Sequence, residues 1–286
     1  MQAKPATALL QADEALARLL TAAPLLGEHE RVATLHAEGR VLADDVRSQM
    51  NVPPMDNSQM DGYAVRSADV PQPGTRLRVT QRIAAGHVGE PLATGTAARI
   101  FTGAPVPAGC DAIVMQEQCQ ADGEHVVVNH VPKPGEWVRP RGMDIQAGSV
   151  ILARGQRLRP QDVGLAASVG LAELPVVRPL RVAVFFTGDE LVMPGEPLPP
   201  GAIYNSNRFV LRALLQRLGC TVLDLGIVPD TLAATRGALR SAAAQADVIV
   251  TSGGVSVGEE DHIKPAVEAE GELTLWQLAI KPGKPL

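Results

Sequence analysis

The sequence predicts an α/β protein of several domains, in which a doubly wound, mostly parallel sheet follows a β-rich segment. From Arg181 onward, apolar strand-like runs alternate with amphipathic helices, which is the pattern of parallel strands joined by crossover helices. Between about Thr75 and Arg154, short alternating strands are separated by Gly, Pro and Asp-Gly turns, which is typical of a β-rich domain. The length of 286 residues agrees with about two domains.

The composition is that of a globular protein. Hydrophobic residues make up 45% and charged residues 20%, and the net charge of -5 argues against a nucleic-acid binder, which needs a basic face. No apolar run approaches the ~20 residues that a membrane-spanning helix requires. Asp13, Glu14 and Arg18 interrupt the N-terminal apolar stretch, which therefore does not read as a signal peptide. The three scattered cysteines fit neither a disulfide framework nor a zinc site and predict a cytoplasmic protein.

Helix and turn signals place the elements of the first 180 residues. Ala8–Leu20 carries an apolar stripe opposite charged residues and predicts an amphipathic helix. A short helical or extended piece is expected over Leu35–Val46. Asp122-Gly123 predicts a hairpin turn between two strands. Pro160 and Gly170 are the residue types expected at the start and the end of a short helix.

The α/β part is predicted to hold four strands and two long helices. The helices are expected over Asn207–Leu218, capped by Asn205 or Ser206, and over Leu232–Ala246, capped by Asp230. The strands are expected at Val182–Phe186, Thr221–Val228, Asp247–Thr251 and Leu273–Ile280. Because ligands of such sheets bind beyond the carboxyl ends of the strands, the loops that follow them are the candidate site.

A glycine loop follows the third strand, over residues 253–258. Glycines let backbone N–H groups surround an anionic oxygen, and Ser256 adds a hydroxyl. The loop lacks both the Walker and the GxGxxG pattern, so a tight turn without a ligand is the alternative. Only five lysines occur in the chain, and two of them, Lys281 and Lys284, follow the fourth strand. They predict contacts to a phosphate or an oxyanion, with a solvated pair as the alternative.

Carboxylates also gather in these loops. Each of them alone could be a helix cap or a solvated side chain. Together, beside a loop suited to anions, they predict a Mg²⁺ ion that is bound partly through a substrate phosphate. The carboxylates concerned are Asp189, Glu190, Asp230 and Asp261.

Five segments, taken in order, resemble the molybdopterin molybdotransferase family, which includes bacterial MoeA and the E domain of gephyrin. The Asn-Ser-x-Met-Asp-Gly-Tyr-Ala stretch is very specific, whereas the glycine loop is shared with MogA-type adenylyltransferases. The segments are Pro54–Arg66, Phe101–Pro107, Thr187–Leu191, Ser252–Gly258 and Lys281–Pro285.

The resemblance implies the last step of molybdenum cofactor assembly, in which molybdate is inserted into adenylylated molybdopterin with Mg²⁺-dependent release of AMP. It also implies an elongated homodimer, whose cleft lies between the MogA-like domain of one subunit and the β-rich domain of the other, and a MogA-type adenylyltransferase as a possible partner. The domains would be a small mixed α/β linking domain (1–48 and 147–178), a β-rich insertion (49–146) and a MogA-like domain (179–286).

Roles are implied for twelve residues by the motifs in which they stand. The implied catalytic residues are Asp61, Thr102, Asp144, Glu190, Asp230 and Asp261, of which Asp230 and Asp261 would position Mg²⁺. The implied contacts to the phosphate-bearing ligand or molybdate are Gly253, Gly254, Ser256, Gly258, Lys281 and Lys284.

The chain departs from the family at two points. Gln277 stands where some relatives have Lys, which puts one cationic contact in doubt. Family members also continue beyond Leu286 with the rest of the ligand domain and a C-terminal β domain, so we expect either a fragment or a truncated homologue, active or inactive.

Two other functions stay open from the sequence. A non-catalytic, gephyrin-like scaffold would not need the carboxylate and lysine set. A MogA-like adenylyltransferase, or a nucleotide pyrophosphatase on the same domain, would not carry the loop Asn57–Gly62 or the β-rich insertion.

Overall fold

The computed structural model describes residues 9–253, 262–274 and 277–280, and it divides into two compact units. We call residues 31–175 the β-rich unit, and residues 1–30 together with 176–286 the sheet unit. Among the described residues, no helix is long and apolar enough to cross a membrane. The finer division into a linking domain, an insertion and a MogA-like domain stays a prediction.

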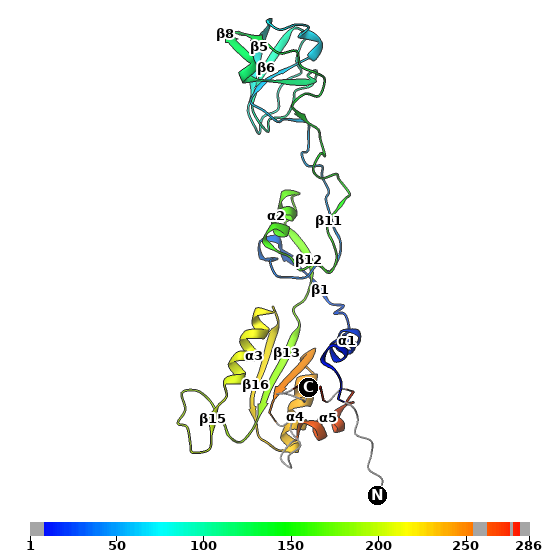
Figure 1. The fold of residues 1–286 in the computed structure, drawn as a ribbon, viewed down its shortest axis with the longest axis vertical. Helices are drawn as coiled ribbons and strands as arrows, with labels where there is room; N and C mark the ends of the chain where they lie inside the picture. The colour runs from blue at the N-terminus through cyan, green and yellow to red at the C-terminus, as the bar shows by residue number, and fades with distance from the viewer. Residues whose placement is uncertain (1–8, 254–261, 275–276, 281–286) are drawn as a thin grey trace. The chain divides into compact units, whose positions relative to one another are not determined.

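Three parallel strands form the centre of the sheet unit (Figure 1). They are β13 (Arg181–Thr187), β16 (Thr221–Val228) and β17 (Val248–Ser252), in the order β16-β13-β17. In the central strand, Val182 pairs with Val222 on one side and Val248 on the other. β13 is buried from its second residue to its last, which is why its sequence is a continuous apolar run.

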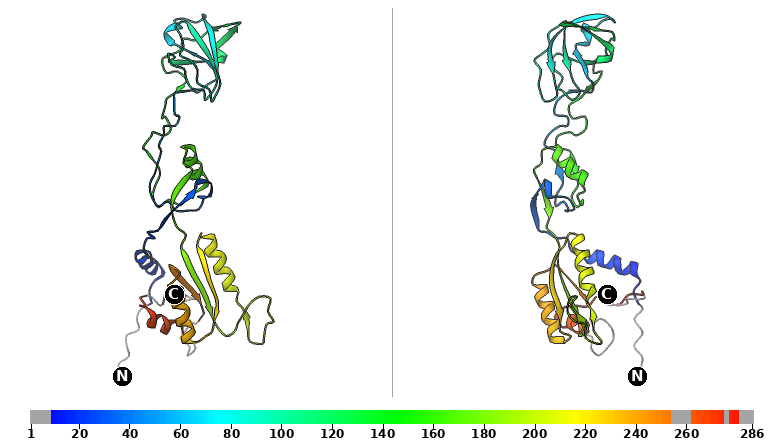
Figure 2. Two further views of the ribbon diagram at one scale, coloured as in Figure 1. Left: turned by 180° about the vertical axis from the view of Figure 1, so that it is seen from behind. Right: turned by 90° about the vertical axis from the view of Figure 1, so that its left-hand side faces the viewer.

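Helices cover both faces of this sheet (Figure 2). On one face Leu211 and Leu215 of α3 (Ser206–Arg217) pack against Phe186. On the other face α4 (Leu232–Ala243) and α5 (Ile263–Glu270) pack around Phe185. The predicted doubly wound α/β arrangement is therefore confirmed.

Two details of the α/β prediction are wrong. The run Leu273–Ile280 does not add a fourth strand to the described sheet; Leu278 forms an isolated parallel bridge with Leu10 instead. Leu278 is buried although its segment does not pair with β17, so its apolar side chain does not require a place in the sheet. The cap of α4 is Thr231, whose Oγ1 accepts a hydrogen bond from Ala234 N at 3.3 Å, and not Asp230. Asn205 caps α3, as predicted.

A six-stranded sheet dominates the β-rich unit, with the order β7-β4-β6-β5-β9-β8 (Figure 1). Only the β5–β6 pair is parallel in this sheet. Side chains of one face surround Val65 and Val126, and those of the other surround Ile83 and Ile100. The strands are β4 (Gly62–Val65), β5 (Thr75–Ile83), β6 (Thr96–Ile100), β7 (Ala112–Met115), β8 (Cys119–Asp122) and β9 (His125–Val128). The predicted hairpin turn at Asp122-Gly123 is confirmed.

The remaining elements are short. A helix α1 lies over Ala12–Ala22, slightly later than the stretch predicted for it, and α2 (Pro160–Ser168) begins at Pro160 as predicted. The piece expected over Leu35–Val46 consists of a 3-10 turn and the start of a strand. The other elements are β1 (His29–Ala33), η1 (Thr34–His36), β2 (Val46–Arg47), β3 (Asn57–Ser58), η2 (Ser67–Asp69), η3 (Gln116–Gln118), β10 (Val138–Arg139), β11 (Val150–Leu152), β12 (Glu173–Val177), β14 (Leu191–Val192) and β15 (Ile203–Tyr204).

An ionic cluster holds the amino ends of β13 and β17 together. Asp247 accepts hydrogen bonds from Arg181 N at 2.8 Å and from Arg178 Nη1 at 2.6 Å, and the carboxylate of Glu28 lies 2.6 Å from Arg178 Nε. The side chains of Arg178 and Asp247 are each only 15% exposed. The hydrogen bonds from Arg178 and Arg181 hold the pKa of Asp247 far below its usual range, so the cluster stays charged in neutral solution.

We expect Phe185→Ala to lower the free energy of unfolding of the protein by about 3–5 kcal/mol, because it opens a cavity between β13 and α4. Phe209→Ala on α3 is the matched control, since that ring is 53% exposed; its effect should stay below about 1 kcal/mol. Urea unfolding followed by circular dichroism measures both. Equal losses for the two variants would contradict the assignment of Phe185 to the core.

Candidate functional site

Asp61 and Thr102 are brought together in the β-rich unit although they are 41 residues apart. Asp61 directly precedes β4, and Thr102 follows β6, the neighbouring antiparallel strand. Thr102 donates two hydrogen bonds to Asp61 Oδ1, from its backbone N at 2.8 Å and from its hydroxyl at 2.6 Å. The two predicted site residues therefore form one fixed polar group at the end of the sheet.

The Thr102 hydroxyl, followed by its backbone N–H, holds the pKa of Asp61 below its usual range, and the charge of Arg99 adds to this effect. Asp61 is consequently ionised in neutral solution. Arg99 lies beside the pair because it donates to the Gly62 carbonyl at 2.8 Å. The carboxylate can accept hydrogen bonds from a ligand, but it cannot act as a general acid near pH 7.

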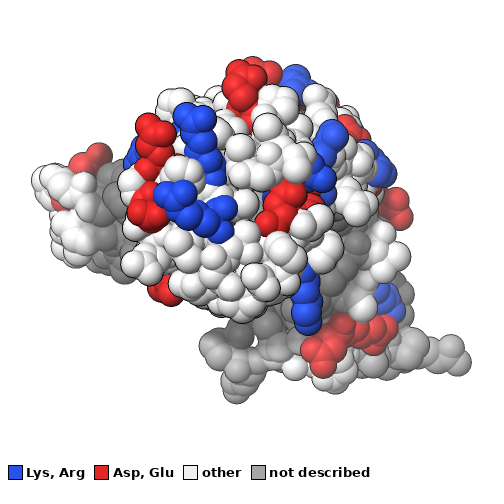
Figure 3. Space-filling view, turned by 90° about the horizontal axis from the view of Figure 1, so that it is seen from above, with Lys and Arg blue, Asp and Glu red and all other residues white. Residues whose placement is uncertain are grey.

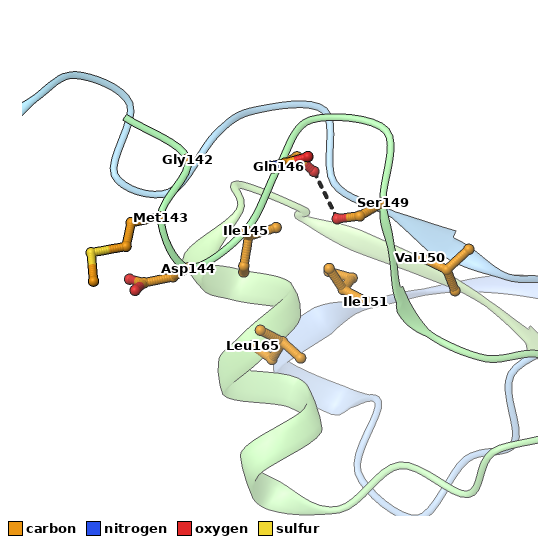
Figure 4. A pocket seen from close by; sticks show the side chains of 9 residues that line it. All are labelled: Gly142, Met143, Asp144, Ile145, Gln146, Ser149, Val150, Ile151 and Leu165. Carbon is orange, nitrogen blue, oxygen red and sulfur yellow. Dashed lines mark hydrogen bonds between the residues drawn. The ribbon is translucent and has the colours of Figure 1, made fainter. Parts of the chain in front are cut away.

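Asp144 lies elsewhere in the same unit, where it forms an ion pair with Arg139. A hydrogen bond from this arginine holds the pKa of Asp144 below its usual range. Figure 4 shows Asp144 at one end of a hollow of about 440 Å³, with Leu165 of α2 at its wall. The lining residues are Gly142, Met143, Asp144, Ile145, Gln146, Ser149, Val150, Ile151 and Leu165. No described hydrogen bond joins Asp144 to the Asp61–Thr102 pair.

The face of the molecule drawn in Figure 3 carries acidic and basic side chains side by side. The ion pairs of the β-rich unit agree with this mixture: Arg76 lies 2.8 Å from Asp122, and Arg78 lies 3.7 Å from Glu124. All four of these side chains are more than half exposed, so each pair contributes little to stability.

In the sheet unit, polar side chains line the carboxyl edge of the three strands. Asn207 Nδ2 at the start of α3 donates to Ser252 Oγ at the end of β17, at 2.9 Å. Thr187 ends β13 and Asn205 precedes α3, and both side chains are almost fully buried. The Thr187 Oγ1 and Asn205 Nδ2 atoms have no hydrogen-bond partner in the described part of the chain. Because buried polar atoms are normally hydrogen-bonded, these two atoms are candidates to bind a polar ligand or water at this edge.

Three predicted residues of the sheet unit lie at or near this edge. Gly253 follows Ser252 with φ of 112°, and a Cβ at this position would overlap with the Thr187 carbonyl, so only glycine fits. Glu190 is exposed, and its carboxylate lies over Gly188. Asp230 is half-buried two residues after the end of β16.

Six of the predicted site residues lie outside the described residues, and their roles stay predictions. They are Gly254, Ser256, Gly258, Asp261, Lys281 and Lys284. Asn207 and Ser252 are residues that the sequence reasoning did not single out as ligand contacts. The position of Asn207 in the first turn of a predicted helix after a sheet strand was the available signal.

Within the ranges that the structure describes, no group of three or more His, Cys, Asp or Glu side chains is placed to hold a metal ion. Mg²⁺ is commonly held by one or two carboxylates and the phosphates of a substrate. Asp230, at the edge where the orphaned Thr187 and Asn205 atoms lie, fits that mode of binding and does not suit a metal held by protein alone.

The three cysteines are free, which agrees with the prediction of reduced thiols, and each is partly buried. Burial raises the pKa of Cys110 to about 12 and that of Cys119 to about 11. Both therefore stay protonated in neutral solution and are poor nucleophiles.

Comparison with family models matches both parts of the chain. The model described as the MoeA N-terminal region (domains I and II) matches residues 10–170. The model described as a probable molybdopterin binding domain matches residues 183–286.

Individual relatives agree with these matches. The chain is 42% identical to the molybdopterin molybdenumtransferase of Haemophilus influenzae over 278 residues, which are 97% of this chain and 69% of that protein. It is 38% identical to the protein of that name from Bacillus subtilis, of which the match covers 62%. The crystal structure of the MoeA protein of Pyrococcus horikoshii aligns with a TM-score of 0.85 at 31% identity, over 97% of this chain and 71% of that one.

Replacement of Thr102 by Val should raise the pKa of Asp61 toward its ordinary value of about 3.9, because the hydroxyl donor is lost while the backbone donor stays. Thr102→Ser keeps the hydroxyl and should leave the pKa low. The carboxyl ¹³C shift of Asp61, followed by NMR between pH 2 and 6, measures the change. Equal titration of Asp61 in both variants would contradict the role of the hydroxyl.

Proposed function

The chain belongs to the molybdopterin molybdenumtransferase family of molybdenum cofactor biosynthesis, and from this premise we propose its reaction. We propose that it inserts molybdate into adenylylated molybdopterin, with Mg²⁺ bound and AMP released. The observation that carries the proposal is that both family models match one chain that is 42% identical to a molybdopterin molybdenumtransferase over 278 residues. The chain spans 59–69% of the length of the first two curated relatives, so its activity stays a proposal.

Asp61 is proposed to bind the pterin. Its Oδ1 atom is occupied by both Thr102 donors, whereas its Oδ2 atom accepts no hydrogen bond from the described residues. A pterin ring carries amide and amino N–H groups, and an ionised carboxylate is a strong acceptor for such donors. Thr102 thus orients Asp61, and its exposed hydroxyl can accept a further hydrogen bond from the ligand.

The carboxyl edge of the sheet unit is proposed to bind the phosphate-bearing part of the substrate and molybdate. Thr187 and Asn205 support this proposal, since each holds a buried polar side-chain atom that has no partner among the described residues. Gly253 allows the backbone to pass close to the Thr187 carbonyl. The predicted contacts from Gly254, Ser256, Gly258, Lys281 and Lys284 belong to the same proposal. Mg²⁺, when bound by Asp230 and Asp261, would neutralise phosphate charge close to the carboxylates.

Catalysis would then rest on orientation and electrostatics. The proposed ligand contacts hold the reacting groups in place. Lys281, Lys284 and the backbone N–H groups of the glycine loop would stabilise the negative charge that leaves with AMP. Asp144 and Glu190 are proposed to help position the substrate, because both carboxylates are exposed. A homodimer in the cytoplasm, with a MogA-type adenylyltransferase as supplier of the substrate, completes the proposal.

The match over residues 10–170 favours this function over a stand-alone adenylyltransferase, which would not need that region. The names of the curated relatives likewise favour an enzyme over a scaffold.

Asp61→Asn should lower the rate of AMP release from adenylylated molybdopterin in the presence of molybdate and Mg²⁺ by about 100-fold, since the substituted amide presents a weaker, neutral acceptor. Asp122→Asn is the matched control, because Asp122 ends β8 at the hairpin with β9 and, among the described residues, its side chain forms an ion pair with the exposed Arg76 alone. Chromatographic measurement of AMP gives both rates. Equal rates for Asp61→Asn and the control would contradict the role of Asp61.

We propose that the site is shared between two subunits, with Asp61 from one and Glu190 from the other, which predicts complementation between two impaired variants. An equimolar mixture of Asp61→Asn and Glu190→Gln chains should regain about one quarter of the normal rate, because half of the dimers are mixed and each mixed dimer holds one intact site. Chains refolded together are compared with each variant alone. A rate no higher than that of the variants alone would contradict a site built from two subunits.

A further inference from the structure

Two arginines lie directly opposite each other on neighbouring strands of the β-rich unit. Arg82 of β5 is the register partner of Arg99 of β6, and Arg99 is in turn the partner of Tyr63 on β4. Because register partners point to the same face of a sheet, the two guanidinium groups share one face. Like charges placed opposite each other in this way destabilise a sheet, so the pair needs a compensating contact.

The compensation within the chain comes from an aromatic ring and not from an acid. The Arg82 guanidinium carbon lies 4.4 Å from the centre of the Phe101 ring, and that of Arg99 lies 4.5 Å from the same centre. Arg99 also lies 5.3 Å from the centre of the Tyr63 ring. One ring thus holds two cations close together, although a cation–π contact at an exposed site contributes only about 0.5–1 kcal/mol.

No carboxylate of the described residues forms an ion pair with either arginine. Arg99 is fixed by neutral acceptors, donating to the Gly62 carbonyl at 2.8 Å and to Gln116 Oε1 at 2.7 Å. The charge of Arg99 lowers the pKa of Asp61, but no ion pair joins the two side chains among the described residues, and Asp61 Oδ1 accepts hydrogen bonds from Thr102. The Arg82 guanidinium is exposed and donates no hydrogen bond to a described residue, so its N–H groups can bind a ligand.

We propose that Arg82 and Arg99 bind one of the two phosphate groups of the substrate, next to the Asp61–Thr102 pair, in addition to the phosphate contacts proposed for the sheet unit. A guanidinium presents paired N–H donors that match the oxygens of a phosphate, and two adjacent guanidinium groups suit a dianion. The pair lies beside Asp61, since Arg99 donates to the residue after it and Gln116 N donates to the Asp61 carbonyl at 3.0 Å. A ligand that carries both N–H groups and a phosphate can therefore contact the carboxylate and the arginines together.

The choice of a nucleotide phosphate as the probe rests on the proposed function, but the test measures binding and not transfer of molybdenum. AMP and adenosine are titrated into the purified protein by calorimetry, so that their difference reports the phosphate. Arg82→Gln should weaken AMP binding by about tenfold or more, with adenosine unchanged, because a charge-assisted contact is lost. Arg82→Lys keeps the charge without the paired donors and should lie between the two.

Arg78→Gln is the matched control, since Arg78 stands on the same strand and already pairs with Glu124 at 3.7 Å. It should leave AMP binding within twofold of the unchanged protein. Arg99→Lys provides a second test at the other guanidinium, with circular dichroism as the check of folding. Equal AMP affinity in the unchanged protein, Arg82→Gln and Arg99→Lys would overturn the proposal.

Molybdate is titrated in parallel, because it is also a tetrahedral dianion. Weakened molybdate binding with unchanged AMP binding in Arg82→Gln would overturn the assignment to a phosphate. The proposed reaction can fail independently: absence of AMP release with intact, arginine-dependent AMP binding would refute the transfer activity and leave the phosphate site standing.

Discussion

The ionic cluster around Asp247 is the constraint on which the arrangement of the sheet unit depends. It joins Arg178, which precedes β13, and Arg181, the first residue of β13, to the residue that precedes β17. The backbone closes the same junction, since Asp247 N donates to the Arg181 carbonyl at 2.8 Å. With the amino ends fixed in this way, the register carries through to Phe186 opposite Ser252. The close approach of Gly253 to Thr187 and the Asn207–Ser252 hydrogen bond follow from that register.

The two units present different polar groups to a ligand. The β-rich unit places an ionised carboxylate, a hydroxyl and two arginines at the ends of adjacent strands, where directed hydrogen bonds can recognise a ligand. The sheet unit uses the carboxyl edge of a parallel sheet, with buried polar atoms and, at Gly253, a backbone that passes too close to the Thr187 carbonyl for a side chain. In the β-rich unit, Cys110 and Cys119 are held protonated by burial, so neither is a ready nucleophile, which agrees with the proposed reliance on positioning.

Much of the fold could be predicted from the sequence because local patterns determine it. β13 is a continuous apolar run from Val182 to Phe186, and β16 and β17 are mainly apolar. The hairpin at Asp122-Gly123 carries its own turn signal. The prediction of a strand over Leu273–Ile280 was wrong because an apolar run indicates that a segment is buried but does not indicate which other segment packs against it. Leu278 is buried beside Leu10, near the other end of the chain.

Only the site residues that stand in recognisable sequence motifs could be predicted. Asp61 and Thr102 were found through the family resemblance, and nothing local to either residue indicates that one hydrogen-bonds to the other. The Arg82–Arg99 pair was beyond sequence reasoning, because β5 and β6 are parallel and their register shifts between Val79 and Gln81. A shift of this kind reverses which side chains share a face, so the pairing becomes evident only in three dimensions.

The insertion of the β-rich unit within the sheet unit has a consequence for how the chain folds. Residues 9–30 belong with strands that follow them only after residue 175, so their docking is a contact of long sequence separation. Pairing of β1 with β12 joins the two ends of the inserted segment. Once the inserted unit has folded, the entropic cost of closing the chain between Glu28 and Arg178 is that of a short loop. Synthesis from the N-terminus therefore favours folding of the β-rich unit before the sheet unit. The N-terminal helix can pack in the sheet unit only after the strands that follow residue 175 have been made.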